Sequence, residues 1–137
     1  MHAIVAALVL IGWATPGPTT LGKQTQAELN QAAGKDLKDA EAEMTHEMTQ
    51  LLDLLLKRAD GNRGAIAKLT NAQTAWRVYR DAQVAARWPF PEKGRYGSVY
   101  PMCVASELTN LTNARIAELR RMLTSVEGEV CNSQWPD

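Results

Sequence analysis

The chain has 137 residues, of which 15 are Lys or Arg and 15 are Asp or Glu, so its formal net charge at pH 7 is zero. This length is enough for one domain with a real hydrophobic core. The even balance of charge excludes a general electrostatic attraction to nucleic acid or to an anionic membrane.

The first residues have the pattern of a secretion signal. Residues 3–11 form an unbroken apolar run that is too short to span a bilayer as a mature helix. Small residues around Trp13 and a segment rich in Pro and Gly follow, as at a signal-peptidase site. We therefore predict a signal peptide over residues 1–14 and a flexible linker over residues 15–23, with no stable membrane span after cleavage. The alternative is an apolar tail or a misassigned start.

A long helical pattern covers residues 24–58. Its apolar side chains recur at spacings of three and four residues, close to the natural period of a straight α-helix, and polar side chains fill the opposite face. The apolar positions are Ala33, Leu37, Ala40, Met44, Met48, Leu51 and Leu55. Turn-forming residues at 60–64 end the pattern. We predict one long N-terminal helix.

A second helical pattern covers residues 65–87. Trp76 and Tyr79 fall on one helical face, and we predict that both aromatic side chains anchor the core. The residues of this face are Leu69, Ala72, Trp76, Tyr79, Gln83 and Ala86. Arg80 and Asp81 lie beside it, and burying a charge is costly unless the charge is paired. The pair is therefore either a structural polar lock or part of a binding surface.

A loop over residues 88–101 follows, and it holds three of the six prolines and four of the eight aromatic residues. A solvated linker does not need so much aromatic area, so the loop either folds back on the helices or presents a contact surface. A third helical pattern covers residues 102–126, and no segment has the pattern of a strand. We predict an all-α, antiparallel three-helix bundle over residues 24–126 and a C-terminal tail over residues 127–137.

No set of residues has the composition and spacing of an enzyme site. His46 is the one histidine outside the predicted signal peptide, and it lies on a polar helix surface. There is no spaced Cys and His set for zinc, no glycine-rich phosphate loop and no serine elbow. We expect a protein that is not an enzyme and that has no metal and no cofactor.

Three segments, in order along the chain, resemble motifs of the LprI-like lysozyme-inhibitor family of small secreted or periplasmic bacterial helical proteins. They are residues 73–81, 97–102 and 111–119, and the resemblance extends over about residues 24–123. It implies a periplasmic or secreted protein whose partner is another protein, lysozyme or a different cell-wall hydrolase. Members of the family often carry Cys at places that here are Ala32, Val84 and Glu107.

The two cysteines of the chain are Cys103 and Cys131. In an oxidising compartment an even number of cysteines favours a disulfide, which would tie the C-terminal tail to the start of the third helix. The alternative is a pair of free thiols.

The proline-rich loop has the chemistry for blocking a glycosidase cleft, which contains two acidic groups. Lys93 and Arg95 supply positive charge, and Tyr96 and Ser98 supply hydroxyl donors. Anchoring area comes from Trp88, Phe90 and Tyr100. We hypothesise that the loop inserts into such a cleft. The competing interpretation is that its aromatic residues close the open end of the bundle. Other candidate functions are an envelope or stress interaction module and an immunity-type protein.

Arg115 on the inner side of the third helix favours the structural interpretation of the charged pair on the second helix. We predict that Asp81 bonds Arg115, or that Arg80 reaches Glu118, across the interface between these helices. Breaking a buried pair of this kind costs about 3–5 kcal/mol. On this interpretation, Asp81→Ala should clearly lower the melting temperature.

Overall fold

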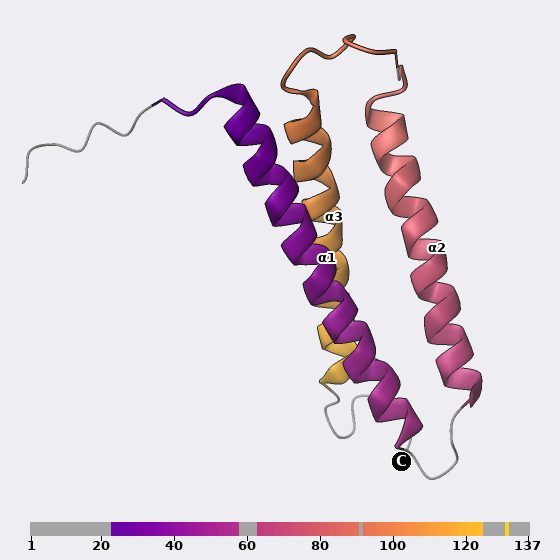
Figure 1. Ribbon diagram of the computed structural model, residues 1–137. Helices are drawn as coiled ribbons and strands as arrows, with labels where there is room; N and C mark the ends of the chain where they lie inside the picture. The colour runs from indigo at the N-terminus through magenta and orange to yellow at the C-terminus, as the bar shows by residue number, and fades with distance from the viewer. Residues whose placement is uncertain (1–22, 58–62, 91, 125–130, 132–137) are drawn as a thin grey trace, which may run out of the picture.

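The computed structural model describes residues 23–57, 63–90, 92–124 and 131. Within these ranges the chain forms three α-helices and no strand: α1 (Gln26–Leu56), α2 (Arg63–Arg87) and α3 (Tyr100–Leu123). Successive helices alternate in direction, so α1 and α3 point the same way and α2 points the opposite way (Figure 1). The prediction of an all-α antiparallel three-helix bundle with a long first helix is confirmed.

The predicted signal peptide lies outside the described residues, as do almost all of the predicted linker and, apart from Cys131, the C-terminal tail. Among the residues that are described, no helix is both long and apolar enough to cross a membrane.

Helix α1 begins with a capping box. The Thr25 hydroxyl accepts a hydrogen bond from the Glu28 backbone N–H at 3.3 Å, and the Glu28 carboxylate accepts one from the Thr25 backbone N–H at 2.7 Å. The reciprocal bonds satisfy N–H groups that have no partner within the first turn of a helix. The bond from the Thr25 backbone is also the main reason why the pKa of Glu28 is lowered. The sequence thus fixes where α1 starts.

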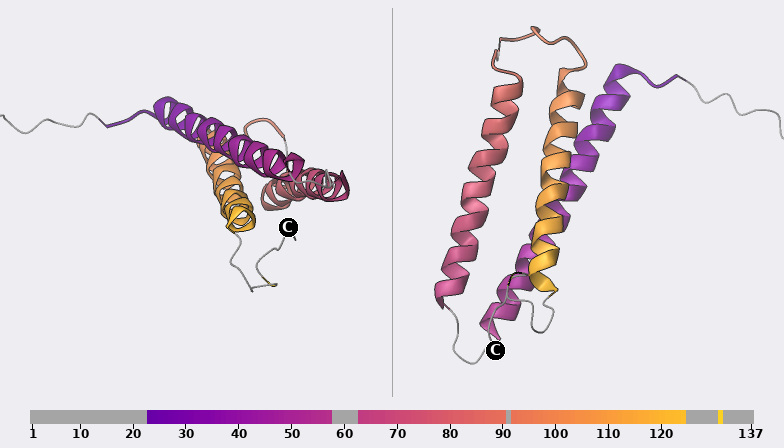
Figure 2. Two further views of the ribbon diagram at one scale, coloured as in Figure 1. Left: turned by 90° about the horizontal axis from the view of Figure 1, so that it is seen from below. Right: turned by 180° about the vertical axis from the view of Figure 1, so that it is seen from behind.

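The core is built mainly between α1 and α3, which cross and pack closely (Figure 2). The residues at its centre are completely or almost completely buried: Met44, Leu51, Leu55, Leu69, Ile116 and Leu119. Only Leu69 of this cluster comes from α2. The apolar face predicted for α1 is confirmed, because its later positions are buried or pack on this cluster.

Helix α2 turns a different face to the bundle than the predicted one. Trp76 packs on the core as predicted, but Tyr79 is 51% exposed, so the prediction that Tyr79 anchors the core is wrong. The inner row is Ile66, Leu69, Gln73, Trp76, Arg80 and Val84. Apolar periodicity missed this row because two of its members, Gln73 and Arg80, are polar and find partners on the other helices.

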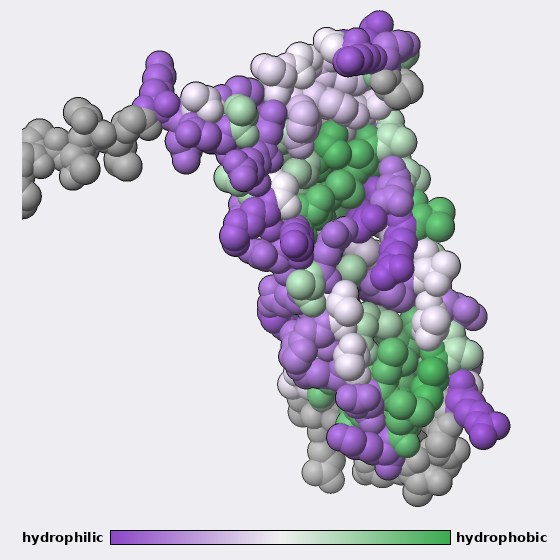
Figure 3. Space-filling view, viewed as in Figure 1, coloured by the Kyte–Doolittle hydropathy of each residue, from purple (hydrophilic) through white to green (hydrophobic). Residues whose placement is uncertain are grey.

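Because α2 contributes little apolar surface to the core, it does not cover that core completely. The face of the bundle that displays α1 and α2 carries two apolar areas separated by a band of polar side chains (Figure 3). Polar contacts therefore make up much of the attachment of α2.

Thr112 of α3 is fully buried, and its hydroxyl has no hydrogen-bond partner among the described residues. Burial of an unpaired hydroxyl costs about 1–3 kcal/mol. Valine has the same shape without the oxygen, so Thr112→Val is expected to raise the free energy of unfolding by about 1 kcal/mol in urea denaturation. Thr109→Val is the matched control, since the Thr109 hydroxyl donates to the Ala105 carbonyl at 2.8 Å. An equal gain in both variants would contradict this explanation.

Candidate functional site

The connection between α2 and α3, residues 88–99, is the candidate site and is called the α2–α3 loop below. Its two turns contain Gly94 and Gly97, with φ of 83° and 73°, a region that side chains with a Cβ rarely adopt. The Gly97 N–H donates to the Gly94 carbonyl at 3.2 Å, and the Tyr100 N–H donates to the Gly97 carbonyl at 3.3 Å. The loop backbone is thus held by bonds of its own.

Aromatic packing holds the base of the loop. The Tyr100 ring lies 6.0 Å from the Trp88 ring in an edge arrangement and is stacked 5.1 Å from the Tyr96 ring. The Tyr96 hydroxyl accepts a hydrogen bond from the Phe90 backbone N–H at 3.1 Å. All three rings are half-buried. Trp88 and Tyr96 therefore contribute to the shape of the loop, as in the interpretation that aromatic residues close this end of the bundle.

The positive charges of the loop face outward. Lys93 and Arg95 are exposed, and neither has a carboxylate partner among the described residues. The Arg95 guanidinium lies 4.4 Å above the ring of Phe90, which is 47% exposed. This stacking places a cation on an exposed apolar surface. Of the aromatic residues that the hypothesis named for anchoring, Phe90 is the one that stays exposed.

The loop is also fastened to α1. Asn30 Nδ2 donates a hydrogen bond to the Ser98 backbone carbonyl at 3.0 Å. Ser98 is exposed, and its role in this contact is that of a backbone acceptor. Because α1 and α3 are parallel, both helices begin at the end of the bundle that carries the loop (Figures 1 and 2). Helix N-termini carry partial positive charge. The positive end of the α3 dipole and the two loop cations thus both favour the approach of an anionic group.

The charged pair of α2 is part of the bundle, but the predicted partners are wrong. Arg80 Nη1 lies 3.0 Å from Glu41 Oε1 of α1, and Arg80 Nη2 lies 2.9 Å from Asp81 Oδ1. The physical reason is the orientation of α2 about its own axis. This orientation directs Arg80 to α1 and leaves the Asp81 side chain 65% exposed. Arg80 also lies 5.4 Å above the Trp76 ring. The lock therefore joins α2 to α1.

On α3, Arg115 and Glu118 bond each other within the helix, at 2.9 Å between Nη1 and Oε2. Arg115 Nε also donates to Gln73 Oε1 of α2 at 3.1 Å. Arg115 thus joins α2 and α3 through an amide and not through Asp81. The side chains of Arg80 and Arg115 are long enough to reach several partners, and the sequence alone could not show which partner each would bond.

The charged cluster between α1 and α3 was not predicted. Glu47 is buried and accepts from Arg120 Nε at 2.8 Å, while Glu43 bonds the same guanidinium. The hydrogen bonds to Glu47 and then to Glu43 raise the pKa of Arg120. The signal was present in the sequence, because Glu47 falls on the apolar face of α1 between Met44 and Leu51. A carboxylate at such a place needs a cation on the neighbouring helix.

Asp81→Ala is now expected to change the free energy of unfolding by no more than about 0.5 kcal/mol, because exposed ion pairs contribute little. Thermal and urea denaturation followed by circular dichroism will measure it. Arg80→Ala is the comparison, since it also removes the bond to Glu41 and the contact with Trp76. A large loss of stability for Asp81→Ala alone would show that this carboxylate has a further role.

The predicted disulfide is not present, and Cys103 and Cys131 are free thiols. Cys103 lies in the first turn of α3, so about 30 Å of helix separates it from Leu123. The eight residues from Leu123 to Cys131 reach at most about 29 Å when fully extended. A bridge would therefore require the tail to run straight back along the whole of α3.

These features define a small helical protein whose distinctive surface is a folded loop with exposed cations. The described residues contain no group of three His, Cys, Asp or Glu that could hold a metal ion. The chain matches the family described as lysozyme inhibitor LprI over residues 19–119, and it belongs to that family. The resemblance seen in the three sequence motifs is thereby confirmed, and lysozyme inhibition is the function attached to the family.

A relative in Rhizobium meliloti (strain 1021), the uncharacterized protein R02472, is 35% identical over 119 residues. The aligned part covers 82% of this chain and 84% of that protein. No solved structure matches the chain.

Proposed function

We propose that this protein inhibits a lysozyme-type cell-wall glycosidase by placing the α2–α3 loop in the cleft of the enzyme. The observation that carries the proposal is the pair of exposed cations, Lys93 and Arg95, on a loop whose backbone and base are already fixed. Membership of the lysozyme-inhibitor family supplies the class of target.

The chemistry of the target favours cations at the tip of the loop. Lysozyme-type glycosidases use two carboxyl groups on either side of the bond that they cleave. The planar guanidinium of Arg95 can donate two hydrogen bonds to one carboxylate, and the Lys93 ammonium can approach the other as a compact charge. A loop held there would exclude the polysaccharide and occupy the acid and base groups that it needs.

The fixed shape of the loop favours tight binding. A flexible loop would lose backbone and side-chain freedom on entering the cleft, and this loss weakens affinity. In the α2–α3 loop, the glycine turns, the stack on Tyr100 and the bond from Asn30 have already restricted that freedom. Phe90, beside Arg95, would supply apolar contact area.

The proposed target acts on the cell wall, outside the cytoplasm. We therefore propose that the protein works in the periplasm or after secretion, which agrees with the signal peptide predicted over residues 1–14.

A cell-wall lysis assay tests the proposal. Purified protein is added to lysozymes of several classes, and the rate of clearing is measured at low and at physiological ionic strength. We expect inhibition of at least one class, and a higher inhibitory concentration at higher salt, because salt screens the attraction between exposed charges. If no lysozyme is inhibited and none binds in a pull-down, the proposed function is wrong.

A further inference from the structure

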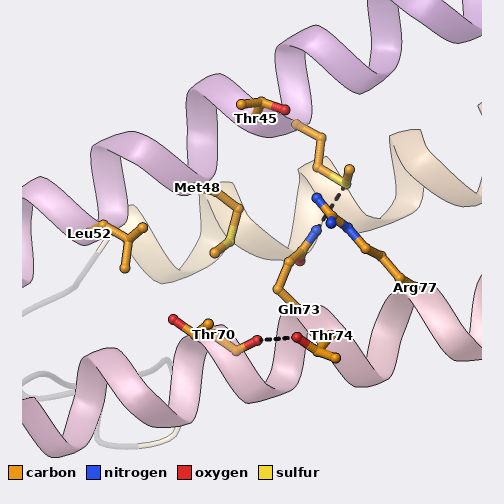
Figure 4. Close-up of a pocket in the computed structure, with 8 residues that line it drawn as sticks. Thr45, Met48, Leu52, Thr70, Gln73, Thr74 and Arg77 are labelled. Carbon is orange, nitrogen blue, oxygen red and sulfur yellow. Dashed lines mark hydrogen bonds between the residues drawn. The ribbon is translucent and has the colours of Figure 1, made fainter.

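A pocket of about 230 Å³ lies between α1 and α2 (Figure 4), and none of its lining residues belongs to the α2–α3 loop. Met44, Met48 and Leu52 of α1 form its apolar side, and Thr70, Thr74 and Arg77 of α2 lie opposite. This is called the α1–α2 pocket below. It exists because α2 approaches α1 through a few polar contacts and leaves part of the apolar face of α1 uncovered.

The polar groups around the pocket are mostly occupied. The Thr70 hydroxyl donates to the Ile66 carbonyl at 2.9 Å, and the Thr74 hydroxyl donates to the Thr70 carbonyl at 3.1 Å. Gln73 Nε2 donates to the Met44 sulfur at 3.3 Å, and its oxygen accepts from Arg115. The hydroxyl protons of both threonines, one amide proton of Gln73 and its oxygen are therefore already bonded within the protein.

Arg77 differs from the other lining residues. Its side chain reaches from α2 toward Gln73 at the edge of the pocket (Figure 4). Unlike Arg80, Arg115 and Arg120, it has no carboxylate partner among the described residues. The pocket thus combines an apolar interior with one permanently charged donor at its edge. An anion attached to an aliphatic chain complements both parts.

We propose that the α1–α2 pocket binds a free aliphatic monocarboxylate, with its chain against the two methionines and its carboxylate on Arg77. The volume equals that of roughly seven or eight water molecules, so the pocket fits a chain of about six to eight carbons. Methionine suits such a site because its flexible thioether adapts to the shape of a ligand. This inference does not rest on the proposed function, because the pocket is separate from the loop.

Methionine methyl groups provide a direct test. The intact protein is labelled with ¹³C at its methionine methyls, and hexanoate is titrated while NMR shifts are recorded. The Met44 and Met48 methyls are expected to shift with saturation, whereas those of Met102 and Met122, which lie outside the pocket, stay in place. Equal shifts at all four methyls, or no shift up to about 20 mM hexanoate, would overturn the proposal.

Variants and probes test the role of the charge. Arg77→Gln is expected to raise the dissociation constant for hexanoate about tenfold or more, because it removes a charge-assisted hydrogen bond. Lys68→Gln is the matched control, since Lys68 is an exposed cation of α2 that does not line the pocket. Hexanol and hexylammonium should bind more weakly than hexanoate. If they bind equally well, or if Arg77→Gln has no effect, the assignment of Arg77 is wrong.

Discussion

Replacing both loop cations, Lys93→Gln with Arg95→Gln, is expected to raise the concentration of protein needed to inhibit the lysozyme at least about a hundredfold. The reason is the environment that these groups meet in the complex. In solution both groups are exposed and have no carboxylate partner among the described residues. Against the carboxylates of a cleft, each would form a hydrogen bond between charged groups that contributes about 1.5–3 kcal/mol.

The matched control for this variant is Lys57→Gln with Lys68→Gln. Both lysines are exposed, and two are replaced in each variant, so the control changes the net charge by the same amount. Lys57 caps the end of α1 and Lys68 lies near the start of α2, and these helix ends lie opposite to the loop (Figure 1). It should inhibit like the unmodified protein. If the loop variant retains its inhibition within about threefold, the binding surface lies elsewhere on the molecule, even if the protein is an inhibitor.

Leu119→Ala is expected to lower the free energy of unfolding by about 3–5 kcal/mol. Leu119 has no solvent-exposed surface and lies in the cluster that joins α1 and α3. Removal of its side chain loses apolar burial and leaves a cavity that two long helices cannot easily close. Domains of this size have a total stability of only about 5–15 kcal/mol, so the loss would be a large fraction of the whole.

Urea denaturation followed by circular dichroism measures the effect, with Leu56→Ala as the control. Leu56 is the same residue type in the last position of α1, but it is 64% exposed. Its replacement should change the stability by less than about 0.5 kcal/mol. A loss below about 1 kcal/mol for Leu119→Ala would mean that the contact between α1 and α3 is not the main source of stability.

The three helices could be predicted because each is long and has a clear helical period. The face predicted for α1 was also correct, since its apolar residues recur along most of the helix. The face of α2 was not, because its inner row mixes Leu69 and Trp76 with Gln73 and Arg80. The prediction for Tyr79 rested on its helical spacing from Trp76, and the structure leaves it exposed. The bonds from Arg80 to Glu41 and from Arg115 to Gln73 decide the orientation, and such bonds depend on neighbours that one helix does not reveal.

The place of the candidate site was visible in the sequence, because the loop concentrates proline, glycine and aromatic residues. The division of roles within it was not. Trp88 and Tyr96 pack at the base, whereas Lys93 and Arg95 remain exposed with Phe90 beside them. Whether a ring packs inward depends on the direction in which the glycine turns point the chain. The disulfide prediction was wrong for a related reason, because α3 is continuous over most of the sequence between Cys103 and Cys131.

The parallel pairing of α1 with α3 affects how the chain acquires its structure during synthesis. These two helices form the tightest contact, yet the whole of α2 and both connections lie between them in the sequence. A ribosome releases α1 long before α3 exists, so the apolar stripe of α1 has no main partner until most of the polypeptide has been made. The core between α1 and α3 can therefore be completed only late in synthesis, and a late core suits any protein that is threaded across a membrane before it folds.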